Sequence, residues 1–211
     1  MLIDITQTTR PGKAYRPGSP ALQIEEVRCL AGTPEEYRTL RFSAAAHNMG
    51  THIDIMRAGT EIPPDRLIGE GIRFDVSHCP GSIVEMADLD LSLVKTGVFV
   101  FFQTGWNPEG ENEEPHKEIS LEVISHLSSK GANMIGTDAP GLGRGRNHAL
   151  IDKFLGDREQ WAIENLVNLE ALPASGFKVY CLPLKIQGLD ALPARILAEV
   201  PDSPDKGREE N

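Results

Sequence analysis

The thirteen residues 46–58, AHNMGTHIDIMRA, combine the side-chain types that bind divalent metal ions. A β-strand places residues i and i+2 on one face, so we expect His52 and Asp54 to point the same way. An imidazole and a carboxylate that converge from a rigid strand are natural ligands for Zn²⁺ or Mn²⁺. The same alternation puts Asn48 on their face and directs His47 away from it.

Two further acid–base residues lie far downstream. His148 occurs in RNHALID, and Glu164 occurs in WAIENLVNLEAL. Taken singly, His148 is compatible with a helix-start residue and Glu164 with a solvated helix face. Their value as site residues depends on the segments around them.

The elements that must position these side chains are mostly strands. Alternating or continuous apolar runs predict strands near residues 2–5, 21–30, 37–46, 72–77 and 98–105, a further strand at 132–140, and a late one at 177–186. Apolar residues at helical spacing, followed by Gly131, predict a helix over 119–131. The segment 157–172 fits a helix or a mixture of helix and strand. We therefore expect one α/β domain over residues 1–200 and a charged tail without fixed structure at 201–211.

Composition excludes several classes of protein. The net charge of −10 and the absence of a basic cluster argue against nucleic acid as a partner. No apolar run is long enough to span a membrane, and the N-terminus does not resemble a signal peptide. The three cysteines, Cys29, Cys79 and Cys181, are widely spaced and form no CxxC pair. Free thiols of this kind fit a cytoplasmic protein.

Several segments together resemble the cyclase family of metal-dependent hydrolases, whose best-known members are bacterial kynurenine formamidases. The resemblance runs nearly end to end, and the matching segments occur in the family's order: YRPGSP, NMGTHID, QTGW, EPHKEISLEVISHLSSKGANMIGTDAP, HALID, ENLVNLEAL and GFKVYCLPLKIQGLDALPARILA. Any one of these segments is common, but this many in order is specific.

The resemblance implies a swivelling β/β/α fold with mixed sheets and a few helices, a homodimer or homotetramer, and one or two divalent metal ions. His52 and Asp54 match the ligands of the family's GTHxD motif, and His148 and Glu164 match its later histidine and glutamate. Such ligands let a divalent ion lower the pKa of bound water, which can then attack an amide or lactone carbonyl. His148 and Glu164 lie further apart than is usual in the family, because KFLGDREQ resembles a small insertion.

The chain departs from the family motif HxGTHxDxPxH at three positions. The first histidine slot holds Asn48, the proline slot holds Met56, and the last histidine slot holds Ala58. Asn48 can offer an amide oxygen as a weak ligand, and His47 can replace it only if a bulge re-aims the side chain. Alanine cannot transfer a proton, so the family's acid–base group at this position is absent. These losses favour one ion over two.

Three functional hypotheses follow. The first is a hydrolase of a formamide, cyclic amide or lactone, in which His148 or Glu164 transfers protons and His52, Asp54, His148, Glu164 and Asn48 are the candidate ligands. The second is an impaired homologue that binds a metal ion or a small acid without hydrolysis. The third is a structural subunit with an empty cleft. Retention of four candidate ligands favours the first two.

Overall fold

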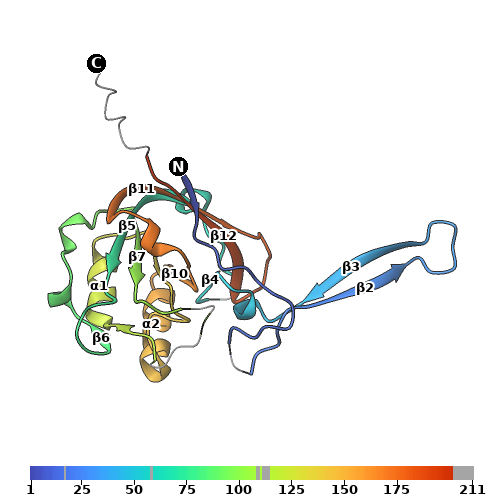
Figure 1. Ribbon diagram of the computed structural model, residues 1–211, viewed down its shortest axis with the longest axis horizontal. Helices are drawn as coiled ribbons and strands as arrows, with labels where there is room; N and C mark the ends of the chain where they lie inside the picture. The colour runs from blue at the N-terminus through green and yellow to red at the C-terminus, as the bar shows by residue number, and fades with distance from the viewer. Residues whose placement is uncertain (17, 58, 108–109, 111–114, 202–211) are drawn as a thin grey trace, which may run out of the picture.

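The structure of the protein, a computed structural model, describes residues 1–16, 18–57, 59–107, 110 and 115–201. Seven strands close into a barrel in the order β12-β11-β5-β7-β9-β10-β4, with β4 pairing back to β12, and β1 adds to the outer edge of β12 (Figure 1). The strands β5, β7, β9 and β10 run parallel to their neighbours in this series, whereas the remaining pairs of the ring are antiparallel. The expected α/β fold with mixed sheets is confirmed.

The seven barrel strands are β4 His52–Asp54, β5 Ile68–Asp75, β7 Phe99–Gln103, β9 Met134–Thr137, β10 Trp161–Glu164, β11 Ser175–Pro183 and β12 Ala191–Glu199, and the added strand β1 is Leu2–Asp4. Two small sheets pair β2 Gln23–Cys29 with β3 Tyr37–Ser43, and β6 Ile83–Val84 with β8 Glu118–Ile119. The helices are α1 Leu121–Ser129 and α2 Gly145–Gly156, with 3₁₀ turns η1 Ala46–Asn48, η2 Pro64–Arg66, η3 Met86–Asp88, η4 Leu91–Leu93 and η5 Leu169–Ala171.

Two apolar cores lie on the two faces of the barrel wall. One fills the interior and includes Phe99, Phe101 and Phe177. The other lies between the outer face and the two helices and includes Val100 and Phe102. Strand β7 thus contributes alternate residues to both cores, as its continuously apolar sequence predicts for a strand buried on both faces.

The helix α1 begins and ends at residues that satisfy its terminal backbone groups. Ser120 is the N-cap, and its hydroxyl accepts a hydrogen bond from the Val123 amide at 3.3 Å. Gly131 follows the last turn with φ of +77°, a backbone conformation that favours glycine. The helix predicted for residues 119–131 is confirmed, with bounds two residues shorter at each end.

The segment 145–172 differs from its prediction in its first part and agrees with one of two predicted alternatives in its second. The helix α2 covers residues 145–156, which we assigned to no helix beyond a possible start at His148. The segment 157–172, for which we predicted a helix or a mixture of helix and strand, contains strand β10 and the short 3₁₀ helix η5, which agrees with the mixture. The strand forms because Trp161–Glu164 pairs with β9 on one side and β4 on the other, so tertiary pairing overrides a local pattern that also suited a helix.

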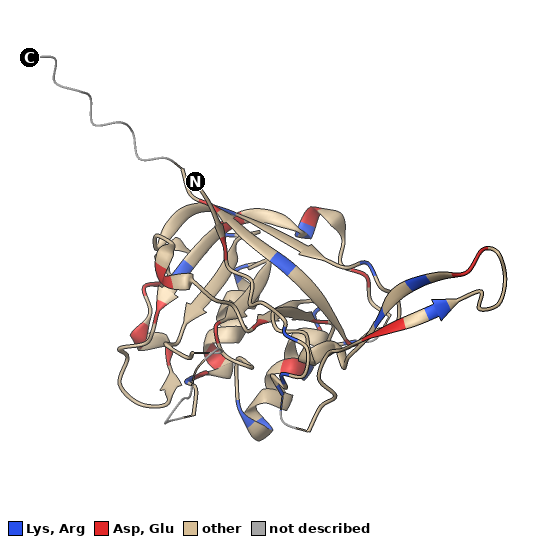
Figure 2. Cartoon of the chain, turned by 45° about the vertical axis from the view of Figure 1, so that its right-hand side comes forward, with Lys and Arg blue, Asp and Glu red and all other residues tan. Residues whose placement is uncertain are grey.

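Strands β2 and β3 form a long hairpin that projects away from the barrel (Figure 1). The two strands predicted at residues 21–30 and 37–46 are therefore present, with bounds 23–29 and 37–43. Both acidic and basic residues lie along this hairpin (Figure 2). We call residues 23–43 the arm.

No helix in the described part of the chain is both long and apolar enough to cross a lipid bilayer. The expected tail at 201–211 lies outside the described residues except for its first position.

Candidate metal centre

A tight turn delivers the chain into strand β4. Gly50 has φ of +70°, and a Cβ atom there would lie 3.1 Å from both the Gln7 carbonyl and the Thr9 hydroxyl. Thr51 follows it, accepting a hydrogen bond from the Gln7 amide at 2.7 Å and donating one to the Asn165 carbonyl at 2.6 Å. The Gly-Thr pair thus fixes the approach to His52, since only glycine tolerates both the conformation and the close packing.

His52 and Asp54 share the outer face of the barrel wall. Ile53, between them, points into the barrel core, so strand alternation places its two neighbours on the opposite face. The side chains are nearly inaccessible, and His52 Nε2 lies 3.2 Å from Asp54 Oδ1. His52 Nδ1 lies 2.8 Å from the Gly50 carbonyl, which can only accept. A neutral His52 therefore carries its proton on Nδ1 and presents the Nε2 lone pair to the cluster.

Glu164 reaches the same point from the neighbouring strand. The antiparallel register of β10 and β4 sets Glu164 directly opposite His52, and Ile163 opposite Ile53. Residues paired in this way lie on one face of the sheet, so the Glu164 carboxylate comes within 3.4 Å of His52 Nε2. Three of the four residues that the family resemblance suggested as ligands, His52, Asp54 and Glu164, are thus brought together.

His47 also joins the cluster, which corrects the expectation that it points away. Residues 46–48 form the 3₁₀ turn η1 instead of continuing a strand, so strand alternation does not govern their direction. His47 Nδ1 lies 3.1 Å from Asp54 Oδ1, and its Nε2 lies 3.3 Å from a carboxylate oxygen of Asp190. One ligand atom each from His47, His52 and Asp54 lies within 4.8 Å of the other two.

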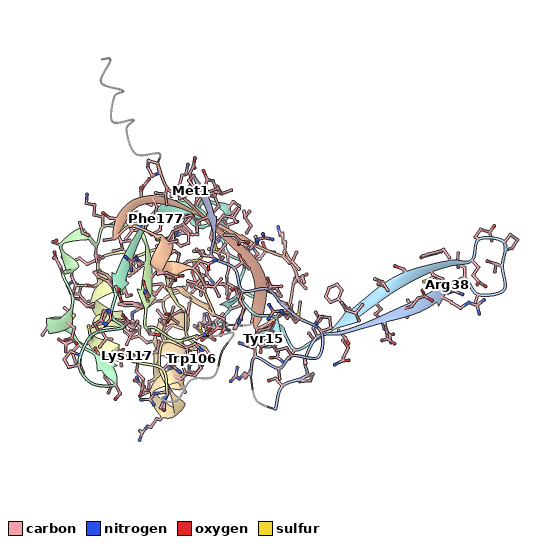
Figure 3. All side chains as sticks on the ribbon, viewed as in Figure 1. Met1, Tyr15, Arg38, Trp106, Lys117 and Phe177 are labelled. Carbon is pink, nitrogen blue, oxygen red and sulfur yellow. The ribbon has the colours of Figure 1, made fainter. Side chains whose placement is uncertain are left out.

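Asn48 faces the other way. Its Oδ1 accepts hydrogen bonds from the backbone amides of Tyr15 and Arg16 at 2.5 and 2.8 Å, and its Nδ2 donates to the Ser19 carbonyl at 3.1 Å. Figure 3 labels Tyr15 where the N-terminal loop passes the base of the arm. Both acceptor positions of this amide oxygen are filled, so Asn48 holds the backbone at Tyr15, Arg16 and Ser19 and has no lone pair left for a metal ion.

Replacing Asn48 with alanine is therefore expected to cost stability but to leave metal binding intact. The change removes three hydrogen bonds of a side chain with 0% exposure, and we expect the free energy of unfolding to fall by about 2–4 kcal/mol. Urea unfolding measures this loss, and metal titration of the folded variant measures the affinity. Asn133→Ala is the control, because Asn133 is buried but donates only one bond, to the Arg66 carbonyl. A loss of metal affinity without unfolding would instead make Asn48 a ligand.

His148 lies outside the compact group. It projects from the first turn of α2, and its Nε2 lies 3.1 Å from a carboxylate oxygen of Asp152, one helical turn later. The loop before α2 packs against the imidazole ring of His148, since a Cβ atom on Gly141 would lie 2.6 Å from His148 Nδ1. The imidazole of His148 is near enough to Glu164 to offset a small part of the rise that burial and Asp54 cause in the Glu164 pKa.

Asp152 is a site residue that sequence reasoning missed. Besides contacting His148, its carboxyl is within electrostatic reach of Asp54 and His47. Burial and the charge of Asp54 raise its pKa. The i, i+4 spacing of His148 and Asp152 offers a signal for this pair, but only once the segment is known to be helical.

A second polar network anchors the start of α2. The Glu118 carboxylate accepts hydrogen bonds from the Arg144 backbone amide at 3.0 Å, the Arg144 guanidinium at 3.1 Å, and the Asn147 amide at 2.8 Å. Arg144 is thereby held against a nearly buried acid. The network fixes the turn of the helix that carries His148.

The charges of the cluster depend on one another. Burial opposes protonation of His52, but the Asp54 and Glu164 carboxylates outweigh it and raise the His52 pKa well above its ordinary value. Contact with Asp54 raises the pKa of His47. Burial disfavours the Asp54 anion, yet the two imidazoles keep the Asp54 pKa below its usual range. Burial and the charge of Asp54 raise the pKa of Glu164. The cluster therefore needs positive charge at its centre.

The donor set fits a divalent cation. Within the described residues, His52 Nε2 and Asp54 Oδ1 are buried atoms with no hydrogen-bond partner of normal geometry, although they lie 3.2 Å apart. Buried polar atoms are rarely left in this state. Two imidazole nitrogens and carboxylate oxygens form a ligand set typical of Zn²⁺ or Mn²⁺. A bound cation would satisfy both atoms and supply the missing positive charge. Ala58, the vacant histidine slot, lies outside the described residues.

Comparison with known families agrees with this geometry. The model of the Cyclase family, described as "Putative cyclase", matches residues 3–144. A kynurenine formamidase from Erythrobacter litoralis is 30% identical over 212 residues, which cover 95% of this chain and 94% of that protein. This chain belongs to the cyclase family. The matched range of the family model includes His47, His52 and Asp54 and ends before α2 and β10.

Solved structures share the fold. Isatin hydrolase A from Labrenzia aggregata superposes with a TM-score of 0.76 at 19% identity, covering 95% of this chain and 93% of its own. A predicted metal-dependent hydrolase from Bacillus stearothermophilus has a TM-score of 0.72 at 25% identity, with 94% and 97% covered. The barrel with its outer helices is therefore a cyclase-family fold.

Proposed function

We propose that this protein is a metal-dependent hydrolase that cleaves a C–N amide bond, in a formamide or cyclic amide, or a lactone. The observation that carries the proposal is the convergence of His47, His52 and Asp54, with Glu164 opposite, around two buried atoms that lack partners. Family members named for the hydrolysis of a formamide and of isatin, a cyclic amide, support the bond type.

The residues divide into two groups by their position. His47, His52, Asp54 and Glu164 would hold the ion, with His148 as a further candidate ligand. A bound divalent ion would supply Lewis-acid polarisation of the carbonyl and activation of a water molecule. His148 and Asp152 contact each other on helix α2. We assign to one of them, or to Glu164, the transfer of a proton to the leaving nitrogen or oxygen.

Metal loading followed by a substrate panel tests this function. Protein purified without chelator is dialysed against Zn²⁺ or Mn²⁺, and its metal content is measured by elemental analysis. We expect about one equivalent or more to be retained, and then hydrolysis of at least one member of a panel of N-formyl anilides, cyclic imides and lactones. Activity should disappear on chelation and return with the ion. Less than about a tenth of an equivalent after reconstitution would contradict the proposal.

One observation favours a second candidate function, the binding of a metal ion or a small acid without hydrolysis. The last histidine slot of the motif holds Ala58, which cannot transfer a proton. If the protein binds metal but hydrolyses no member of the panel, it acts instead as a binder of metal or of a small acid. The panel therefore separates the two functions, since both predict metal binding and only the hydrolase predicts turnover.

A further inference from the structure

A buried asparagine directly follows the candidate ligand Glu164. Asn165 is only 5% exposed, and its φ of +57° lies in the left-handed region, which residues other than glycine adopt uncommonly. Strand β10 ends at Glu164, so this conformation begins at the next residue along the chain. Conformations of this kind persist only where the surrounding structure holds them, and they occur often at functional sites.

The surrounding structure holds Asn165 through three of its groups. Its backbone amide donates a hydrogen bond to the Ala139 carbonyl at 3.1 Å, and its carbonyl accepts one from the Thr51 hydroxyl at 2.6 Å. Its side-chain amide donates to the Gly50 carbonyl at 3.3 Å. Asn165 therefore ties the end of β10 to the loop after β9 and to the turn that leads into β4, the strand beside β10 (Figure 1).

The Gly50 carbonyl is shared between Asn165 and a candidate ligand. His52 Nδ1 lies 2.8 Å from the same oxygen that accepts the Asn165 amide. A carbonyl only accepts, so the nitrogen of the Asn165 side chain, and not its oxygen, must face it. The two donors together fill both lone pairs of this oxygen. The direction of the Gly50 carbonyl sets the direction of the His52 ring, and Asn165 holds that carbonyl.

We propose that Asn165 is a positioning residue of the metal centre, which joins two ligands from different strands. Its side-chain amide fixes the His52 ring through the Gly50 carbonyl, and its backbone fixes the point at which Glu164 leaves β10. The inference rests on the proposed metal site. Hydrogen bonds that orient a ligand histidine typically change metal affinity by about 10- to 100-fold when they are removed.

Replacing Asn165 with glycine tests this role. Glycine adopts the left-handed conformation freely, so Asn165→Gly removes the side-chain amide without straining the backbone. The Gly50 carbonyl, held by one donor fewer, can then turn together with the His52 ring. We expect the affinity for Zn²⁺, measured by titration calorimetry, to fall by about 10- to 100-fold, while circular dichroism shows a folded protein. A residue that serves only the turn would lose no affinity in this variant.

Asn168→Gly is the matched control. Asn168 also has a φ of +57°, and its side-chain amide also donates to a backbone carbonyl, that of Asp4 at 2.8 Å. It lies three residues further along the chain, and its bond leads away from the turn at Gly50. The variant loses the same kind of bond at the same backbone conformation, so we expect the affinity of the wild type.

Nuclear magnetic resonance of the metal-free protein gives a second measurement. The Nδ1 proton of His52 exchanges with solvent only when its bond to the Gly50 carbonyl opens. In protein labelled with ¹⁵N-histidine, we expect this proton to exchange at least about 10-fold faster in Asn165→Gly than in the wild type, and at the wild-type rate in Asn168→Gly.

The two measurements separate the positioning role from the proposed function. A wild-type protein that retains no metal would contradict the proposed hydrolase, yet the exchange rates of the metal-free protein would still decide the role of Asn165. Equal exchange rates in the wild type and in Asn165→Gly would overturn the proposal. Wild-type Zn²⁺ affinity in a folded Asn165→Gly protein would overturn it as well.

Discussion

Replacing His52 with alanine is expected to abolish metal binding and, with it, hydrolysis. His52 is the hub of the cluster, since its Nε2 lies within 3.4 Å of carboxylates from both β4 and β10. Without the imidazole, Asp54 and Glu164 face each other across a cavity with no nitrogen ligand from the strand. Metal content should fall below about a tenth of an equivalent, and turnover should fall by about three orders of magnitude or more.

Elemental analysis and isothermal titration calorimetry measure this loss. The matched control is His126→Ala, because His126 lies on α1 and takes no part in the cluster. Thermal unfolding of both variants shows whether the fold is kept. In the wild type, the metal must displace protons from imidazoles whose pKa values are raised, so affinity should decrease as the pH is lowered. A His52→Ala protein that still holds a full equivalent of metal would show that the site has been misplaced.

The sequence predicts the strand half of the site well. Strand alternation alone brings His52 and Asp54 together. In β4, Ile53 lies in the barrel core, so its two neighbours point to the opposite face. The position of Glu164 depends on the register between β10 and β4, two strands more than a hundred residues apart. No local pattern encodes that register, so only the resemblance to a family pointed to Glu164.

The sequence gives little indication of helix α2, which carries the other residues of the site. The start of α2 reads GLGRGRN, which has no side-chain cap, and its glycines favour a loop. What holds the first turn is the Glu118 carboxylate on β8, a residue 26 positions before Arg144. Asp152 escaped notice for the same reason, because its pairing with His148 exists only on a helix.

Local sequence patterns also do not predict that the arm projects away from the barrel. Both strands, Gln23–Cys29 and Tyr37–Ser43, can be read from their alternation and β-branched or aromatic residues, and the structure contains them. Whether a predicted hairpin joins the main sheet or leaves it depends on pairing partners that local sequence does not specify. The exposed apolar side chains of the arm, Ile24, Leu40 and Phe42, are consistent with a hairpin that leaves the main sheet.

Replacing His47 with alanine is expected to weaken metal binding by about 100-fold. His47 lies one position before the motif's first histidine slot, yet it contacts Asp54 at 3.1 Å, because the 3₁₀ turn redirects its side chain. Its loss leaves a centre of one imidazole and two carboxylates. Calorimetric titration with Zn²⁺ or Mn²⁺ gives the change in affinity, and the exposed His78→Ala, far from the cluster in the sequence, serves as the control.

The same position allows a sharper test with His47→Ala combined with Asn48→His. The double variant restores the family's HxGTHxD spacing. The motif alone therefore predicts that the affinity for the metal ion recovers. The structure predicts no recovery, because the side chain at position 48 points toward the backbone of Tyr15 and Arg16, whose amides need an acceptor. Histidine there would collide with the loop or leave those amides unsatisfied. Wild-type affinity in a folded double variant would show that slot 48 faces the metal after all, whereas continued loss would assign the ligand to position 47.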